Sequence, residues 1–284
     1  MIKLDAATVL LQWATGGLFF LWITTRRREV GIGYGWLLRG TYLLMAAAAA
    51  IIGVRVEAVP VRDACAALVA LAATIALGVS IVRRRAGVAL ERQRVASRSA
   101  RVAAMTGIDR AADGPLEGVP EFPPALDLIA PVIGLVGLIS AGIHAGDPAA
   151  LSVARTVVGA AFLGSVTDAM LLGHWYLVQP GLARGPLLEL VRWVEIVWPF
   201  EILVMLWPTG MVSVLNGTID DGYAGLLGWF WVACAVTTIV LVVVTRAALR
   251  ERAYSAVMAA TGLLYLAILT AFGTDLVARA VLAP

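Results

Sequence analysis

The chain has 284 residues, of which 61% are hydrophobic and only 14% are charged, and its formal net charge is +3 at pH 7. This composition excludes a soluble enzyme, a secreted disulfide scaffold and a disordered protein, because each of those classes needs more polar surface. The basic residues are spread over the segments between apolar tracts rather than gathered in one domain. We therefore expect no nucleic acid among the partners.

Apolar tracts about 20 residues long recur along the whole chain. In lipid such tracts can form only helices or closed barrels, and barrel strands alternate polar with apolar residues. No alternation is present, so the sequence predicts an all-α integral membrane protein, a polytopic bundle of about eight transmembrane helices. The tracts run over residues 6–25, 36–54, 63–82, 125–145, 152–178, 187–213, 225–245 and 254–281.

These tracts divide the chain into three parts. Residues 1–82 contain transmembrane helices 1–3, residues 83–124 form a basic and proline-rich cytoplasmic loop, and residues 125–284 contain transmembrane helices 4–8. Within the spans, several glycines indicate faces where helices approach closely. They are Gly134, Gly137, Gly142, Gly146, Gly159 and Gly164.

The first half of the loop has the composition of a helix, with Val88, Val95 and Val102 at heptad spacing between arginines. Two interpretations are open: a basic amphipathic helix lying on anionic lipid headgroups, or a charged extension of the third span into solvent. The second half, residues 113–124, contains too many prolines for a helix.

The basic residues also predict the orientation. Arginines concentrate after the odd-numbered tracts, and short cytoplasmic loops carry the excess of Lys and Arg, so both termini should lie outside. Lys3 is the single lysine among many arginines and alanines, which is typical of a GC-rich bacterial gene. We therefore expect a multi-pass protein of the bacterial cytoplasmic (inner) membrane.

Ionisable residues inside spans are the first candidates for function, because a charge at bilayer depth costs about 2.5–3.5 kcal/mol on insertion scales. The fifth tract contains Asp168 and His174, whose side chains point roughly 120° apart on a helix. The sixth tract contains Arg192 and Glu195, and Arg192 is spaced to bridge Glu195 and Glu189. We expect the fifth and sixth spans to bring these groups into one polar cluster in the inner half of the membrane.

A histidine with a carboxylate and nearby aromatic rings supplies what a quinone headgroup needs: hydrogen bonds and proton exchange in an apolar setting. The candidate cofactor-binding residues are His174, Asp168, Arg192, Glu195, Trp175 and Tyr176. The alternative is structural, with Arg192 in an interhelical ion pair and the two aromatic residues in an interfacial belt.

Haem and metal sites are less favoured by the sequence. His144 and His174 are predicted near opposite membrane faces, so no self-contained bis-histidine haem is expected. His144 is either solvated or a ligand to a haem shared with a partner. Cys65 and Cys234 lie in separate tracts without metal-ligand spacing, and Asp275 with Arg279 is simplest as a helix-end salt bridge.

We therefore expect an integral membrane subunit of a multi-component assembly, a respiratory or other electron-transfer complex, that lines or supports a quinone or lipid pocket. Its partners would be other membrane subunits, with anionic lipid at the basic loop, and the chain alone should not be catalytic. The alternative is a small-solute or proton-coupled transporter that uses Asp168, Glu195 and Glu201.

Overall fold

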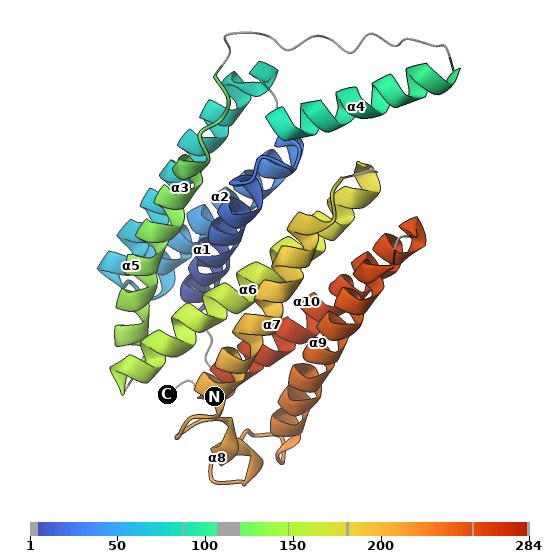
Figure 1. Ribbon diagram of the computed structural model, residues 1–284. Coiled ribbons are helices and arrows are strands. Elements are labelled where there is room, and N and C mark those ends of the chain that lie inside the picture. The colour runs from blue at the N-terminus through green and yellow to red at the C-terminus, as the bar shows by residue number, and fades with distance from the viewer. Residues whose placement is uncertain are drawn as a thin grey trace.

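The computed structural model describes residues 5–86, 88–106, 120–146, 148–179, 182–251 and 253–282. Within these ranges every regular element is a helix (Figure 1). The long helices are α1 (Ala6–Thr25), α2 (Ile32–Val56), α3 (Pro60–Val82), α4 (Ala89–Thr106), α5 (Ile129–His144), α6 (Ala149–Val178), α7 (Gly185–Leu206), α9 (Leu226–Arg250) and α10 (Tyr254–Leu282). Three short ones are η1 (Arg84–Ala86), η2 (Pro124–Leu128) and α8 (Met211–Leu215).

Among the described helices, seven are long and apolar enough to cross a membrane, which supports the predicted multi-pass helical membrane bundle. They are α1, α2, α3, η2 with α5, α6, α9 and α10. The 22-residue α7 is not one of them, because Glu189, Arg192, Glu195 and Glu201 make it more polar.

Helix α1 lies at the centre of the bundle. Its apolar stretch is 72% buried, against 33–44% for the other six candidate spans. It packs on α2 and α5 on one side and on α6 on the other, and α6 continues the contact to α7 and α10 (Figure 1). The result is two groups of helices, α1–α3 with α5 and α6–α7 with α9–α10, that meet along α1 and α6.

The outer faces of the bundle are apolar, as a lipid-facing surface requires. Leu44 is 71% exposed on α2, and Leu269 is 66% exposed on α10. Glycines open the inner faces as the sequence predicts. A Cβ atom on Gly142 would lie 2.6 Å from the Cα atom of Val153, so α5 and α6 touch at this point with no room for a side chain.

The structure corrects one sequence expectation and decides between the two open interpretations of where the basic segment lies relative to α3. The sixth tract was expected to be apolar helix to residue 213, but α7 ends at Leu206, since Pro208 lacks the N–H group that a continuing helix needs.

The basic segment is not an extension of the third span. Helix α3 ends at Val82, and α4 is a separate helix that runs across the end of the bundle opposite the two termini (Figure 1). Residues 107–119, which include more than half of the loop's proline-rich part, lie outside the described residues.

Candidate functional site

The end of the bundle nearer the termini contains a buried ionic cluster between α1, α6, α7 and α10. Its centre is Asp275, which is fully buried on α10. The Nε2 atom of Gln12 donates to both carboxylate oxygens at 3.3 Å, and Nε of Arg279 donates to both at 2.9 Å. Charge-assisted hydrogen bonds between buried groups have little competition from water. The bonds from Gln12 to Asp275 therefore join α1 firmly to α10.

Two arginines extend the cluster to α6 and α7. The Nη2 atom of Arg279 donates to the carbonyl oxygen of Arg155 at 2.6 Å. The Arg155 guanidinium in turn donates to the carbonyl oxygens of Val204, Trp207 and Thr209 at 2.9–3.2 Å. Those carbonyls lie at and beyond the end of α7, where the helix leaves acceptors unpaired. Arg155 therefore caps α7.

Gly159 on α6 makes room for this cluster. A Cβ atom there would lie 2.4 Å from an oxygen of Asp275 and 2.5 Å from Nε2 of Gln12. A methyl group would displace the polar atoms that hold α1 and α10 together. The expectation that Gly159 marks a close helix contact is thus confirmed, although its neighbours are polar side chains rather than an apolar face.

Glu201 on α7 lies beside Asp275, Arg279 and Arg155 and is fully buried. Neither of its carboxylate oxygens has a hydrogen-bond partner among the described residues. Such a group is uncommon in a folded interior, where polar atoms are nearly always paired. Glu201 is therefore a carboxyl group held inside the bundle with its oxygens unpaired.

This cluster is the part of the site that sequence reasoning missed. Asp275 and Arg279 do form the expected i, i+4 ion pair, at 2.9 Å. However, the pair is buried and shared with Gln12 and Arg155, not a simple salt bridge at a helix end. The available signal was the presence of charged residues on α6, α7 and α10 toward the end of the bundle nearer the termini, but the directions in which they face could not be read from spacing alone.

His174 and Tyr265 form a polar pair on the outside of the bundle, between α6 and α10. The Tyr265 hydroxyl lies 3.3 Å from Nδ1 of His174, and the two rings meet edge to face. Both side chains are exposed, with Tyr265 at 43%. The ring that was predicted to face a polar cluster on α7 is thus exposed on the surface of the bundle, beside α10.

Asp168 points the other way, into the centre of the bundle. It is fully buried, and its Oδ1 atom accepts a hydrogen bond from the hydroxyl of Tyr42 on α2. Tyr34, also on α2, donates to the Asp168 carbonyl oxygen at 3.3 Å. The Oδ2 atom has no partner among the described residues. The predicted divergence of Asp168 and His174 around α6 agrees with this placement.

Trp175 and Tyr176 hold the end of α6 and the link to α7. The indole N–H of Trp175 donates to the Gln179 side chain at 3.0 Å, and its ring lies near Tyr34. The hydroxyl of the buried Tyr176 donates to the carbonyl oxygen of Ala183. Both residues therefore have partners that fix local structure.

The charges on α7 were expected to pair along the helix, with Arg192 bridging Glu189 and Glu195. Within the described part of the chain they pair with other helices instead. Glu189 binds Arg26 and Arg27 beyond α1, at 2.7 and 3.2 Å, and Glu195 binds Arg246 on α9 at 2.6 Å. These pairs connect α7 to α9 and to the segment that follows α1, whereas an i, i+3 pair would stabilise α7 alone.

The predicted cluster of Asp168 or His174 with Arg192 or Glu195 is therefore not what the described contacts form. Asp168 bonds to α2, His174 to α10, and Glu195 to α9. Helix rotation explains the difference, because neighbouring spans can share a depth and still present their polar groups in different directions.

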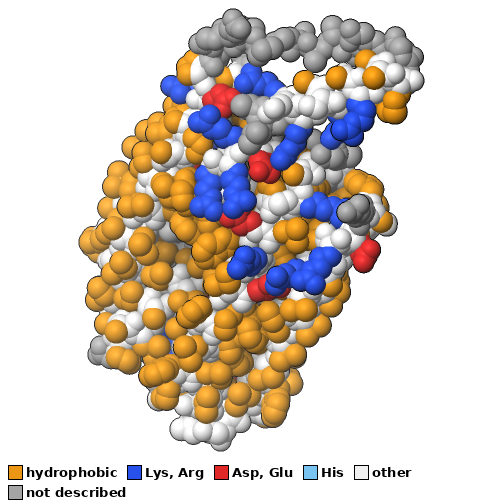
Figure 2. All heavy atoms as spheres, viewed as in Figure 1, with side chains coloured by type: hydrophobic (Ala, Val, Ile, Leu, Met, Phe, Trp, Pro, Cys, Tyr) orange, Lys and Arg blue, Asp and Glu red, His pale blue; other side chains and the backbone are white. Residues whose placement is uncertain are grey.

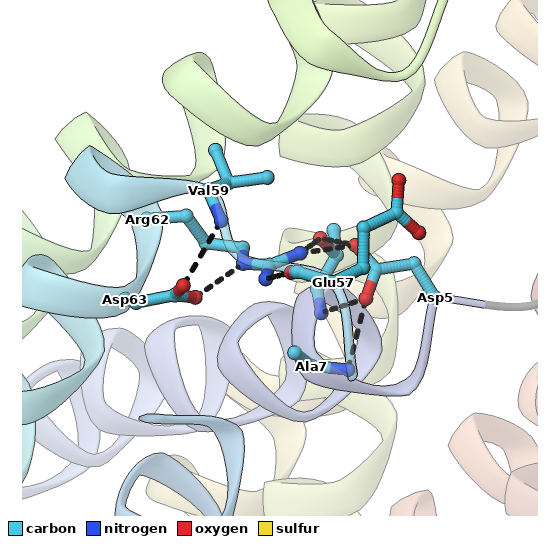
Figure 3. A network of polar contacts seen from close by, with 7 residues as sticks. Asp5, Ala7, Glu57, Val59, Arg62 and Asp63 are labelled. Carbon is cyan, nitrogen blue, oxygen red and sulfur yellow. Dashed lines mark hydrogen bonds and ion pairs between the residues drawn. The ribbon is translucent and has the colours of Figure 1, made fainter. Parts of the chain in front are cut away.

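Two further buried ion pairs act as structural ties. Arg62 on α3 is 1% exposed and binds Asp63, Asp5 and the carbonyl oxygen of Glu57, which joins the start of α3 to the start of α1 (Figure 3). At the opposite end, Arg39 on α2 binds Asp127 in η2 through two bonds of 2.8 and 2.7 Å. Each pair satisfies the charges that it buries.

The two histidines lie at opposite ends of the bundle, since His144 ends α5 and His174 lies near the far end of α6. They cannot ligate one haem together. Within the described ranges, no group of three His, Cys, Asp or Glu side chains is placed to hold a metal ion. Comparison with family models, curated proteins and solved structures finds no match to this chain.

Proposed function

We propose that this chain is a membrane-embedded subunit of an electron-transfer complex, and that His174 and Tyr265 bind the headgroup of a quinone. The observation that carries the proposal is the imidazole–phenol pair itself, exposed on the apolar surface of α6 and α10. A polar pair facing lipid is costly unless something hydrogen-bonds to it. A lipid-soluble molecule with carbonyl groups meets that need.

The donor set fits one quinone carbonyl. When the Tyr265 hydroxyl donates to Nδ1 of His174, the imidazole proton resides on Nε2, which is then free to donate outward. Quinone reduction takes up protons together with electrons, and an imidazole can relay a proton because one ring nitrogen accepts a proton while the other gives one up. The electrons must come from a redox group on another chain, which is why the proposal is a subunit rather than an enzyme.

The proposal includes a topology. We take α7 as an eighth span, because both termini lie at the end of the bundle away from α4, and an even number of crossings returns the chain to one side (Figure 1). The arginine-rich end with α4 would face the cytoplasm of a bacterium, with both termini outside. On this topology α4 is placed to lie on the anionic headgroups of the inner leaflet.

The test is photolabelling of the purified native assembly with an azidoquinone, followed by peptide mapping. We expect label on the α6 or α10 peptides that contain His174 or Tyr265, at least tenfold less label in His174→Ala, and a smaller loss in Tyr265→Phe. His144→Ala is the matched control, because it removes the other exposed histidine from the opposite end. Equal labelling of His174→Ala and the unmodified chain would contradict the proposal.

A second candidate is a proton-coupled transporter, which the unpaired and buried Glu201 favours. A carboxyl group among two arginines and a second carboxylate can bind and release a proton inside the membrane. Liposomes that contain only this chain distinguish the two candidates. Solute uptake driven by a pH gradient and lost in Glu201→Gln supports transport, whereas its absence, together with quinone labelling at His174, supports the first proposal.

A further inference from the structure

A groove of about 550 Å³ opens on the face of the bundle where the segment that follows α1 meets the start of α7 and the end of α9. Four arginines line it, Arg27, Arg192, Arg246 and Arg250, beside the indole of Trp193 and the side chain of Ile196. Figure 2 shows basic and acidic side chains gathered on this face toward the α4 end, with hydrophobic side chains covering the rest. The size is that of a small-molecule site.

The groove has an excess of positive charge that the protein does not neutralise. Its lining includes one carboxylate, Glu189, which is already bound to Arg26 and Arg27. Arg246 is bound to Glu195. Arg192 and Arg250 are exposed, and neither has an ion-pair partner within the described part of the chain. Two guanidinium groups on facing helices are therefore available to one anion.

Guanidinium groups favour phosphate over other anions, because their planar N–H donors match two phosphate oxygens at once. Both arginines also lie toward one end of their helices, and phosphate groups border the hydrocarbon core on each side of a bilayer. Arg192 is seven residues into α7, about 10 Å from its start, and Arg250 is the last residue of α9. The groove thus extends from the end of the bundle toward its apolar middle.

Below the arginines, the same faces of α7 and α9 become apolar. Ile196, Phe200 and Leu203 follow Arg192 on one face of α7 at helical spacing and are 42–55% exposed. On α9, Val243 and Val236 precede Arg246 and Arg250 on one face and are each 53% exposed. A ligand that fits both parts carries a phosphate group at one end and hydrocarbon at the other.

We propose that this groove is a binding site for an anionic phospholipid, with its phosphate between Arg192 and Arg250 and its acyl chains along α7 and α9. The site is separate from the His174–Tyr265 pair, which lies between α6 and α10. It is also separate from α4, so it does not depend on the general attraction of a basic helix for anionic lipid. The proposal stands whether or not the chain binds a quinone.

The test is native mass spectrometry of the delipidated full-length chain in detergent, titrated with phosphatidylglycerol. We expect the double variant Arg192→Gln/Arg250→Gln to weaken binding at least tenfold. Arg101→Gln, which removes an exposed arginine of α4, should change binding less than twofold and is the matched control. Arg192→Lys should fall between them, because it keeps the charge and loses the planar donors.

Two further arms identify the ligand. Phosphatidylcholine, whose headgroup has no net charge, should bind at least tenfold more weakly than phosphatidylglycerol, and inorganic phosphate at millimolar concentration should not displace the lipid. Circular dichroism and gel filtration confirm that the variants are folded. Unchanged binding in the folded double variant, equal binding of phosphatidylcholine, or displacement by inorganic phosphate would each overturn the assignment to an anionic phospholipid.

Discussion

Gly16 on α1 and Gly164 on α6 cross in backbone contact: a Cβ atom on Gly164 would lie 2.2 Å from the carbonyl carbon of Gly16. A Cβ on Gly16 would in turn lie 1.8 Å from the carbonyl oxygen of Ala160. The two groups of helices are therefore joined where neither helix has a side chain. Small residues allow this approach in membranes, where dispersion contacts replace the hydrophobic effect as the cause of helix association.

This crossing predicts the effect of one methyl group. Gly164→Ala should destabilise the fold by about 2–3 kcal/mol, since the obstructing atoms belong to the backbone and cannot rotate away. Thermal unfolding in mild detergent measures the loss. Gly78→Ala on α3 is the control, because nothing lies within 4 Å of its added Cβ, and it should leave stability equal or slightly higher. Equal melting temperatures for the two variants would contradict the crossing.

The buried pair of Arg39 and Asp127 predicts a large and asymmetric cost. Asp127→Asn leaves the 2%-exposed Arg39 without its carboxylate and should destabilise the protein by about 3–5 kcal/mol. The comparison is Glu121, which pairs with the exposed side chains of Arg28 and Arg92, and Glu121→Gln should cost less than about 1 kcal/mol for each ion pair lost. Unfolding in detergent of both single variants measures the difference.

The double variant Arg39→Met/Asp127→Leu tests the cause. It should recover much of the stability that Asp127→Asn loses, because both charges are removed and apolar side chains fill the site. If the double variant is as unstable as the single one, the cost arises from lost packing rather than from an unpaired charge.

The buried ionic cluster predicts different losses of stability when each of its two carboxyl groups is replaced by an amide. Asp275→Asn removes the negative charge that pairs with Arg279 and one of the two oxygens that accept from it, and should cost about 3–5 kcal/mol. Glu201→Gln removes no hydrogen bond among the described residues and should change stability by less than about 1 kcal/mol. The free energies of unfolding of the two variants provide the comparison, and a large loss in Glu201→Gln would show that its charge is a structural partner of the arginines.

Asp221 predicts a pH dependence at the start of α9. Partial burial of this carboxylate acts to raise its pKa, but three backbone N–H groups hold the pKa below its usual value. Those of Gly225 and Tyr223 donate to Oδ1, and that of Leu227 donates to Oδ2, each at 2.9 Å. The folded pKa is therefore below the unfolded value of about 3.9. The stabilisation is complete above the unfolded pKa and is lost as the pH falls through the folded pKa.

Melting temperatures of the unmodified chain and Asp221→Asn should therefore differ at pH 6–7 and converge as the pH falls below the folded pKa. Asp220→Asn is the control, because the Asp220 side chain accepts one backbone N–H, from Gly222, in an exposed turn. A gap between the unmodified chain and Asp221→Asn that stays constant down to low pH would contradict this account.

Hydropathy predicted most helix positions well. The first tract coincides with α1, and the last coincides with α10 to within a residue. An apolar tract in lipid must pair its backbone groups within a helix and exclude charges, so its limits in the sequence are close to those of the helix. The end of α7 was wrong although its signal, Pro208, was present in the sequence. The structure instead places the apolar Met211 and Val212 in the separate short helix α8.

The facing of side chains could not be predicted in the same way. In a soluble helix the apolar stripe points to the core, but here both the core and the lipid are apolar. Val69 is fully buried and Leu71 is 55% exposed on the same helix, and nothing in their hydropathy separates them. For this reason the sequence identified Asp168, His174 and Glu195 as candidates but did not foresee that they face three different helices.

Helix α6 has 30 residues and is about 45 Å long, whereas the hydrocarbon core of a bilayer is about 30 Å thick. A helix of this length fits by tilting or by projecting its ends, and the balance depends on the lipid. His174 lies four residues from the end of α6, within about 6 Å of it. Hydrophobic mismatch therefore controls its surroundings: thin bilayers bring the imidazole toward the wet headgroups, and thick bilayers draw it into dry hydrocarbon.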